Sequence, residues 1–112
     1  MRRVTARTAH DIPERPPLRV APGEQVECGR RDETWPEFVF VTTAHGSGWV
    51  PARHLLGDEG PTEVVAAYDT TELPTEVGQV LEVLDEDLVS GWYWCRAADG
   101  REGWVPISTL EP

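Results

Sequence analysis

The chain has 112 residues, 39% of them hydrophobic and 27% charged, which is too apolar a composition for a disordered chain. Its formal net charge of −10 repels phosphate backbones and argues against nucleic acid as a partner. No apolar run approaches the ~20 residues that cross a bilayer, and no apolar stretch of a secretion signal follows the basic start at residues 1–7. We therefore expect a folded cytoplasmic protein that binds neither membranes nor nucleic acid.

Turn-forming residues set the local pattern. Glycine and proline number ten each, which favours many short strands over long helices. In chain order, residues 38–41 are aromatic and strand-like, and residues 58–62 have the composition of a short linker. The β-rich run 80–84 is expected to end in an acidic turn at residues 85–87.

The last third of the chain gives the clearest signals. The aromatic run 91–97 is separated from a strand at 102–105 by Asp99-Gly100, the strongest short hairpin signal. Pro106 ends that strand, and residues 107–110 suffice for one 3₁₀ turn and a last short strand.

An internal repeat organises these elements. The string Gly-Trp-Val-Pro at residues 48–51 recurs 55 residues later at 103–106, and the same offset aligns residues 22–28 with 77–83. Length alone suggests one domain, but several collinear matches at one offset indicate two units, residues 1–57 and 63–112, joined by the linker 58–62. Five short strands with tight turns in each predict an all-β fold of two small tandem barrels.

The second repeat resembles an SH3 domain. Residues 66–70 (Ala-Ala-Tyr-Asp-Thr) are similar to the family's Ala-Leu-Tyr-Asp-Tyr strand, residues 91–94 to its Gly-Trp-Trp signature, and residues 103–110 to its Gly-φ-φ-Pro-Ser-Asn-Tyr-Val stretch. The first repeat looks like a divergent copy of the kind found in bacterial tandem SH3 proteins. The resemblance implies two tandem SH3-like β-barrels of about five short strands each.

SH3 domains bind Pro-rich peptides, whose proline rings slot between aromatic side chains. The resemblance implies such a groove in the second repeat, flanked by acids that would pair with a basic ligand residue. Its members are Tyr68, Trp92, Trp104 and Pro106, with the acids Glu72, Asp85, Glu86 and Asp87. The corresponding positions of the first repeat, a second candidate groove, are His10, Phe38, Trp49, Pro51 and His54.

Three features separate this chain from the family pattern. Thr70 and Thr109 stand where the family has two further aromatic residues, which removes much of one proline pocket. The loop between Tyr68 and Leu73 is several residues shorter than usual for the family. The groove aromatics also have an alternative role, which is to close the core of a very small barrel, and Trp94 and Phe40 are expected to pack.

Charge and proline placement bear on the ligand. Residues 1–60 carry eight Arg against nine acids, whereas residues 61–112 carry two Arg against eleven acids, so the second repeat is expected to prefer a basic peptide. Residues 13–19 contain Pro-x-x-Pro with nearby Arg. This segment is either an internal ligand for the acidic groove or a lengthened first loop of the first repeat.

Catalytic signals are weak. Cys28 and Cys95 occupy apolar strand positions, which indicates reduced core thiols rather than nucleophiles. The three histidines show no metal-binding spacing, and no Gly-rich phosphate loop or nucleophile elbow is present. We expect no catalytic residue, no metal and no cofactor.

The leading hypothesis is a non-catalytic protein-interaction module whose second barrel binds an extended, basic or Pro-containing segment of a partner protein. The alternative is a structural or regulatory subunit whose exposed aromatics pack against a larger partner or a second copy of the chain. The oligomeric state and the partner's identity stay open at this point.

Overall fold

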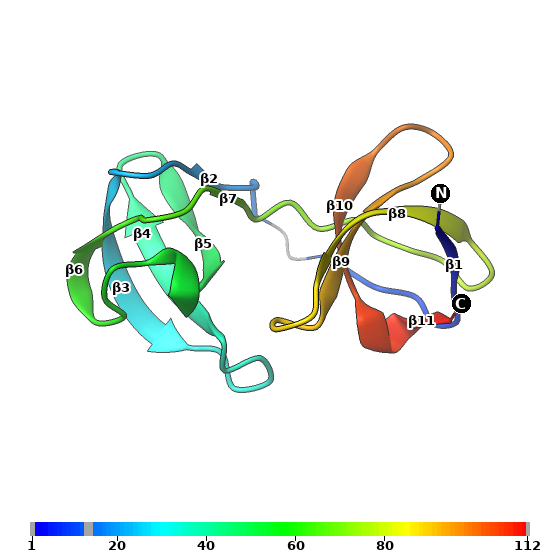
Figure 1. Ribbon diagram of the computed structural model, residues 1–112, viewed down its shortest axis with the longest axis horizontal. Helices are drawn as coiled ribbons and strands as arrows, with labels where there is room; N and C mark the ends of the chain where they lie inside the picture. Colours follow the sequence, from blue (N-terminus) through cyan, green and yellow to red (C-terminus); the bar gives the residue numbers. More distant parts are fainter. Residues whose placement is uncertain (1, 13–14, 112) are drawn as a thin grey trace. The chain divides into compact units, whose positions relative to one another are not determined.

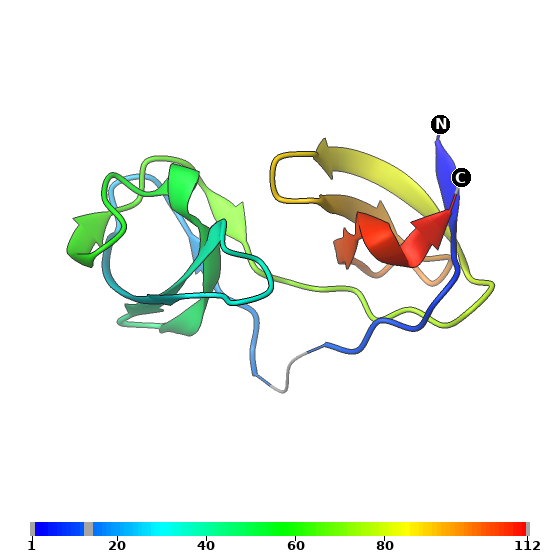
Figure 2. The same cartoon turned by 90° about the horizontal axis from the view of Figure 1, so that it is seen from below.

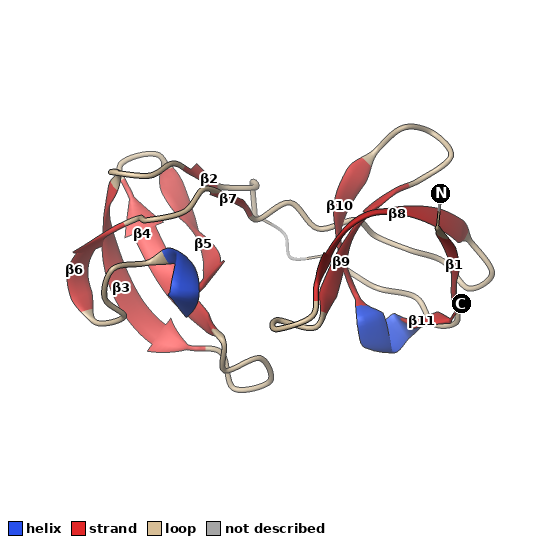
Figure 3. Ribbon diagram, viewed as in Figure 1, coloured by secondary structure: helices blue, strands red, loops and turns tan. Residues whose placement is uncertain are grey.

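The computed structural model describes residues 2–12 and 15–111, which form antiparallel β-sheets joined by tight turns and short 3₁₀ segments (Figures 1 and 3). The expected all-β class is confirmed. The chain divides into two compact units, which are described separately. The inner unit is the continuous segment Pro16–Thr70, and the outer unit combines Met1–Arg15 with Thr71–Pro112.

The outer unit is one five-stranded sheet in the order β10-β9-β8-β1-β11. Its elements are β1 (Arg3–Ala6), β8 (Val80–Asp87), β9 (Trp92–Arg96), β10 (Glu102–Pro106), η2 (Ile107–Thr109) and β11 (Leu110–Glu111). Figure 1 shows the dark blue β1 beside the red β11, because the first described strand of the chain fills the gap between β8 and β11. The 3₁₀ turn and last strand expected at residues 107–110 are present.

The first strand belongs to the core of the outer unit. Side chains alternate across a strand, so Val4 and Ala6 point inward while Arg3 points to solvent. Val4 lies opposite Leu81, and Ala6 lies opposite Leu110. The buried core is Val4, Ala6, Leu73, Leu81, Tyr93, Cys95, Ala97, Val105 and Leu110. Two of these nine side chains come from residues 1–15.

The inner unit has a four-stranded sheet, β5-β4-β3-β6, and a two-stranded sheet, β2-β7. Its elements are β2 (Arg19–Val20), β3 (Gln25–Arg31), β4 (Phe38–Thr43), β5 (Gly46–Pro51), η1 (Ala52–His54), β6 (Gly60–Glu63) and β7 (Tyr68–Asp69). Its buried apolar side chains include Leu18, Val20, Val26, Val39, Val41, Val50, Leu55 and Val64. Figure 2, from below, shows the green β7 at the point where the chain leaves this unit.

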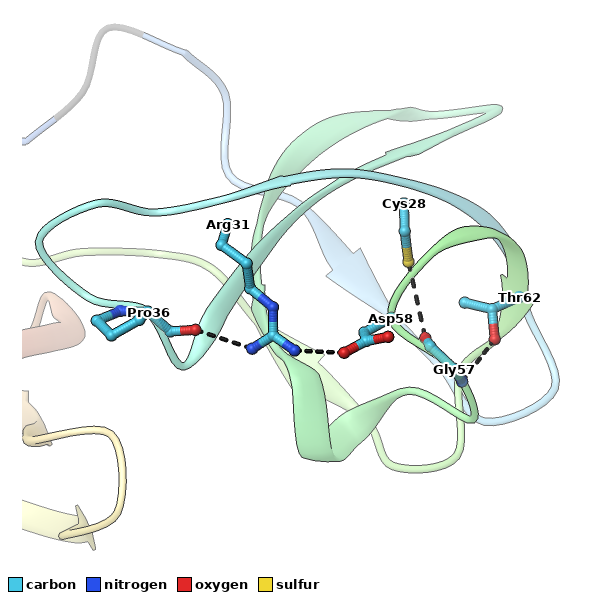
Figure 4. A network of polar contacts seen from close by, with 6 residues as sticks. All are labelled: Cys28, Arg31, Pro36, Gly57, Asp58 and Thr62. Atoms are coloured by element: carbon cyan, nitrogen blue, oxygen red, sulfur yellow. Dashed lines mark hydrogen bonds and ion pairs between the residues drawn. The ribbon is translucent and has the colours of Figure 1, made fainter.

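The segment expected to be a linker, residues 58–62, is built into the inner unit (Figure 4). Residues 60–63 form β6 and pair with β3. The amide of Gly57 donates to Thr62 Oγ1 at 2.8 Å, which closes the turn before the strand. Arg31 donates to the backbone oxygen of Pro36 at 2.8 Å and forms an ion pair with Asp58. The linker composition of this segment therefore reflects a tight turn leading into a strand.

The unit boundaries differ from those expected from the repeat. Residues 1–15 pack with the second repeat, and residues 60–70 pack with the first. The two repeats have exchanged their opening segments, because β1 pairs with β8 and β11 while β6 pairs with β3. Local patterns could not show this, because an alternating strand reads the same whichever sheet edge it joins.

The exchange also equalises charge. The outer unit holds six Arg against eleven acids, and the inner unit holds four Arg against nine acids. Each unit therefore has a formal charge of −5, unlike the uneven halves of the linear sequence. Within the described residues, no helix is long and apolar enough to cross a membrane.

Candidate functional site

The candidate site of the outer unit centres on Trp92, at the start of β9. The His10 ring lies edge-on to Trp92, with ring centroids 5.6 Å apart and planes at 74°. His10 Nε2 lies 3.0 Å from Glu72 Oε1, and because a carboxylate only accepts, the imidazole donates. These two side chains are 13% and 23% exposed, and Trp92 itself is only 9% exposed. The predicted groove residues Trp92 and Glu72 are thus joined by His10, which was predicted for the other groove.

Strand pairing places the remaining predicted residues around Trp92. Pro106 lies directly opposite Trp92 on β10. The hydroxyl of Thr109 donates to the Pro106 carbonyl at 2.8 Å, so this residue closes the 3₁₀ turn in place of an aromatic ring. Because Pro106 is buried, the alternative role as a core-closing residue describes much of this cluster.

The acidic residues 85–87 lie on a strand, so the expected acidic turn is wrong. The strand β8 continues to Asp87, which pairs with Trp92, and the turn falls at residues 88–91. The β-ladder continues because the register shifts between Val83 and Asp85 at a bulge. At the turn, Leu88 and Val89 are 69% and 66% exposed.

Arg2 neutralises part of this acidic strand. Its guanidinium forms an ion pair with Glu86, donates to Tyr93 Oη at 2.8 Å and lies 4.9 Å from the centre of the Tyr93 ring. The hydrogen bond to Tyr93 is the main cause of a raised Arg2 pKa. Sequence reasoning missed Arg2 because it lies 84 residues from its acidic partner. Asp85 and Asp87 accept backbone N–H groups of Glu86 and Ser90.

Trp104 packs with Trp94 and is half-buried. The two rings are 5.2 Å apart at 77°, and Trp94 Nε1 donates to Glu102 Oε1 at 2.9 Å. The predicted groove residue Trp104 and the predicted packing residue Trp94 thus form one aromatic pair, which leaves part of each ring accessible.

Gly103 allows residues 71–73 to cross β10. A Cβ at Gly103 would lie 2.7 Å from the backbone carbon of Glu72 and from the backbone nitrogen of Leu73. The amide of Trp104 donates to the Thr71 carbonyl at 2.9 Å, and the amide of Leu73 donates to the Trp104 carbonyl at 3.1 Å. The position of Glu72 beside Trp92 therefore depends on the missing side chain at residue 103.

The candidate site of the inner unit centres on Tyr68. Its ring contacts His54 edge-on at 5.1 Å and Phe38 at 6.5 Å between centroids. Pro51 lies opposite Phe38 on the neighbouring strand. His54 Nδ1 lies 3.1 Å from the Ala67 carbonyl, an arrangement in which the imidazole donates. Tyr68 and Phe38 are buried, at 9% and 6% exposure.

Trp49 is the inner counterpart of Trp104. It packs against Phe40 at 5.0 Å and 71°, and the Arg30 guanidinium lies 5.2 Å from its ring centre. Both rings of the pair are half-buried. Each unit therefore carries one buried aromatic–imidazole cluster and one half-buried aromatic pair on the same hairpin.

The two predicted groove sets are crossed in one residue each. Tyr68, predicted for the second repeat, lies with Phe38 and His54 of the first repeat. His10, predicted for the first repeat, lies with Glu72 and Trp92 of the second. Trp104 and Trp49, which were predicted for these grooves, lie instead in separate pairs with Trp94 and Phe40.

The Pro-x-x-Pro segment lies only partly within the described residues, because Pro13 and Glu14 fall outside them. Its end belongs to the inner unit. Leu18 is buried at 4% exposure, and Arg19 Nε lies 3.0 Å from Asp69 Oδ2. This end of the segment leads into β2, which pairs with β7 in the two-stranded sheet of the inner unit.

Both cysteines are free and buried. Burial raises the pKa of Cys95 to about 11, and burial together with Asp58 and Glu27 raises the pKa of Cys28. A raised pKa disfavours the reactive thiolate. Across residues 2–12 and 15–111, no group of three or more His, Cys, Asp or Glu side chains could hold a metal ion.

Comparison with known proteins matches one part of the chain to a family. Residues 62–112 match the variant SH3 domain. The chain is also 39% identical over 88 residues to human and mouse proteins named SH3 and PX domain-containing protein 2B, an alignment that covers 64% of this chain. It spans only 9% and 10% of the length of those relatives. No solved structure gives a significant match.

The SH3 match crosses the boundary between the structural units. Residues 62–70 lie in the inner unit, whereas residues 71–112 lie in the outer unit. The outer unit instead takes residues 1–15 as its opening segment. The matched sequence and the folded unit are therefore not the same set of residues.

Proposed function

We propose that this chain is a non-catalytic protein-interaction module, made of two SH3-like barrels, that binds an extended, basic or Pro-containing segment of a partner protein. The match of residues 62–112 to the variant SH3 domain carries this proposal, because SH3 domains in general bind protein segments. The cytoplasmic location expected from the sequence remains part of it.

The chemistry of both units suits such a ligand. Each hairpin presents a half-buried aromatic pair, Trp94 with Trp104 and Phe40 with Trp49. Aromatic faces accept proline rings, and a polyproline segment loses little conformational entropy on binding. Each unit has a formal charge of −5, so a cationic peptide is favoured over an anionic one.

The equal charge of the two units removes the reason for ranking the second repeat as the better binding site. The linear sequence favoured the second repeat because of its excess of acids, but Arg2 is paired with one of those acids and the units carry the same net charge. We therefore treat the two units as equal candidates and let experiment rank them.

The test is to titrate the full chain with an Arg-flanked Pro-x-x-Pro peptide. Binding is monitored through the ¹H–¹⁵N signals of the five tryptophan indoles. Trp92, Trp94 and Trp104 report on the outer unit, and Trp35 and Trp49 report on the inner unit. We expect saturable, salt-sensitive shifts that are lost when the prolines of the peptide become alanine. The absence of saturable shifts would reject the proposal.

Trp104→Ala and Trp49→Ala are matched variants, because they occupy the same repeat position and both side chains are half-buried. The variant that weakens binding identifies the binding unit, and the other serves as its control.

Packing against a larger partner or a second copy is the second candidate, and it is favoured by the exposed pair Leu88 and Val89. Light scattering of the full chain separates the two. A stable dimer with no peptide response would support packing.

A further inference from the structure

We infer that each candidate site is a composite of both repeats, so that the SH3-matched segment 62–112 does not contain its own complete site. The opening segment of each repeat, with its site residue His10 or Tyr68, completes the other repeat's unit within one chain. Calling the clusters sites rests on the proposed function, whereas the exchange itself can be tested without any ligand.

The backbone of the outer unit fixes the first opening segment. The Ala6 amide donates to the Gln79 carbonyl at 2.8 Å, and the Gly78 amide donates to the Ala6 carbonyl at 2.7 Å. One residue further, the Arg7 amide donates to the Thr109 carbonyl at 2.9 Å. Residues 6–7 are thus bonded to both ends of the second repeat.

The inner unit repeats this arrangement with the other opening segment. The Val64 amide donates to the Glu24 carbonyl at 2.9 Å, and the Gly23 amide donates to the Val64 carbonyl at 2.8 Å. The Val65 amide then donates to the His54 carbonyl at 2.8 Å. These are the same three bonds at equivalent repeat positions, so the exchange is reciprocal and holds over the whole opening segment.

The site residues follow their backbones. His10 pairs with Thr75 through two backbone hydrogen bonds of 3.2 Å, and its ring reaches Glu72 and Trp92. Tyr68 pairs with Val20 at the equivalent place of the inner unit. The exchange therefore places an imidazole in the unit that carries most of the SH3 resemblance, and the tyrosine in the other.

A turn that cannot form explains why the chain exchanges. Thr70 and Leu18 bond to each other, since the Thr70 amide donates to the Leu18 carbonyl at 2.9 Å and the Leu18 amide donates to Thr70 Oγ1 at 2.7 Å. Leu73 is the repeat equivalent of Leu18. A contiguous second repeat would therefore place Thr70 opposite Leu73, with Thr71 and Glu72 as a two-residue turn.

Two-residue hairpin turns need positive φ at one or both central residues, which Gly, Asn and Asp supply and a β-branched residue opposes. Thr71-Glu72 lacks these residues. A connection too short to reverse favours exchange of the strand it carries. The short loop between Tyr68 and Leu73 is thus the feature that directs the exchange.

Cysteine pairs test the inference in the full chain. Thr5 lies opposite Val80 in the exchanged fold. The inner equivalent of Val80 is Gln25, which lies opposite Glu63 and would face Thr5 in a contiguous fold. Facing residues of antiparallel strands lie within the Cα separation that a disulfide spans.

Two double variants are compared, Thr5→Cys/Val80→Cys and Thr5→Cys/Gln25→Cys. They share the cysteine at residue 5 and differ only in the position of its possible partner. We expect an intrachain disulfide between the two introduced cysteines in the first variant and none between them in the second. Mass spectrometry of the digested, non-reduced monomer reads the result. Disulfide formation only in the second variant would overturn the inference. Linked dimers in the first variant would also overturn it, by showing that the exchange runs between chains.

A second readout keeps the test independent of cross-linking. We expect His10→Ala to shift the Trp92 indole signal of the ligand-free chain, because the His10 ring packs edge-on against it. We expect Tyr68→Ala to leave that signal in place, because Tyr68 packs with Phe38 and His54 in the inner unit. The reverse result would contradict the composite site. A failed peptide titration would reject the proposed function but leave both of these outcomes unchanged.

Discussion

The inner and outer units have similar folds, but one is a continuous stretch of the chain and the other is made of two separate stretches. The inner unit is one continuous segment of 55 residues, Pro16–Thr70, whereas the outer unit is assembled from residues 1–15 and 71–112 around that segment. When the inner unit is folded, it holds the two parts of the outer unit on a short tether. When it unfolds, the outer unit must close a 55-residue loop, which costs roughly 3 kcal/mol of chain entropy. This loop-closure cost couples the two units reciprocally, so unfolding of either unit should lower the stability of the other by the same amount.

The equivalent core substitutions Leu18→Ala and Leu73→Ala break this comparison most directly. The two side chains are 4% and 1% exposed at the same repeat position, and each truncation should cost about 2–5 kcal/mol in its own unit. We expect each substitution to lower hydrogen-exchange protection most in its own unit and, through the loop-closure cost, by up to roughly 3 kcal/mol in the other unit. Equal and local losses would show that the tether does not couple the units.

The glycine pair Gly103 and Gly48 tests how tightly each loop crosses its hairpin. A Cβ at Gly103 meets the Glu72 and Leu73 backbone at 2.7 Å, while one at Gly48 meets the Thr70 side chain at 3.2 Å. Backbone cannot move aside as a methyl group can, so Gly103→Ala should cost about 1–3 kcal/mol. Gly48→Ala should cost less, as urea unfolding followed by tryptophan fluorescence would show. Similar costs would show that the loop does not cross β10 more tightly at Gly103 than its counterpart crosses β5 at Gly48.

An insertion in the connection after Thr70 tests whether its short length causes the two repeats to exchange their opening segments. Four Gly/Ser residues between Thr70 and Thr71 would give the second repeat a turn long enough to reverse. We expect the disulfide yield of Thr5→Cys/Val80→Cys to fall and that of Thr5→Cys/Gln25→Cys to rise. The same insertion after Asp99, in the existing hairpin turn, is the control and should change neither yield.

Local sequence signals predicted much of the fold. The hairpin at Asp99-Gly100 forms, with Gly100 at φ +91°, and the 3₁₀ turn follows Pro106 where the proline pattern indicated. These features depend on two to four neighbouring residues. The acidic turn at 85–87 was wrong because a bulge lets the strand continue, and bulges leave no mark in the alternating pattern.

Non-local pairing was the part that sequence reasoning missed. His10 and Tyr68 were assigned to the grooves nearest in sequence, although the short loop after Tyr68 was already visible. The alternation of residues 3–6 fits either sheet equally, so the deciding information lies in the two-residue connection Thr71-Glu72. Turn chemistry, applied at that point, would have predicted the exchange.

The two cysteines give the smallest expected effect and a kinetic form of the same comparison. Burial raises the pKa of Cys95 to about 11, so its thiolate fraction rises with pH throughout the neutral range and stays small at pH 8. Cys95 has no exposed surface, so its alkylation by iodoacetamide should require opening of the outer unit. Leu18→Ala should therefore speed the alkylation of Cys95, although Leu18 lies in the other unit. Because the coupling is reciprocal, Leu73→Ala should likewise speed the alkylation of Cys28 in the inner unit. Peptide mass spectrometry of timed samples measures both rates, and an unchanged rate for the cysteine of the other unit in both variants would show that the loop does not couple the units.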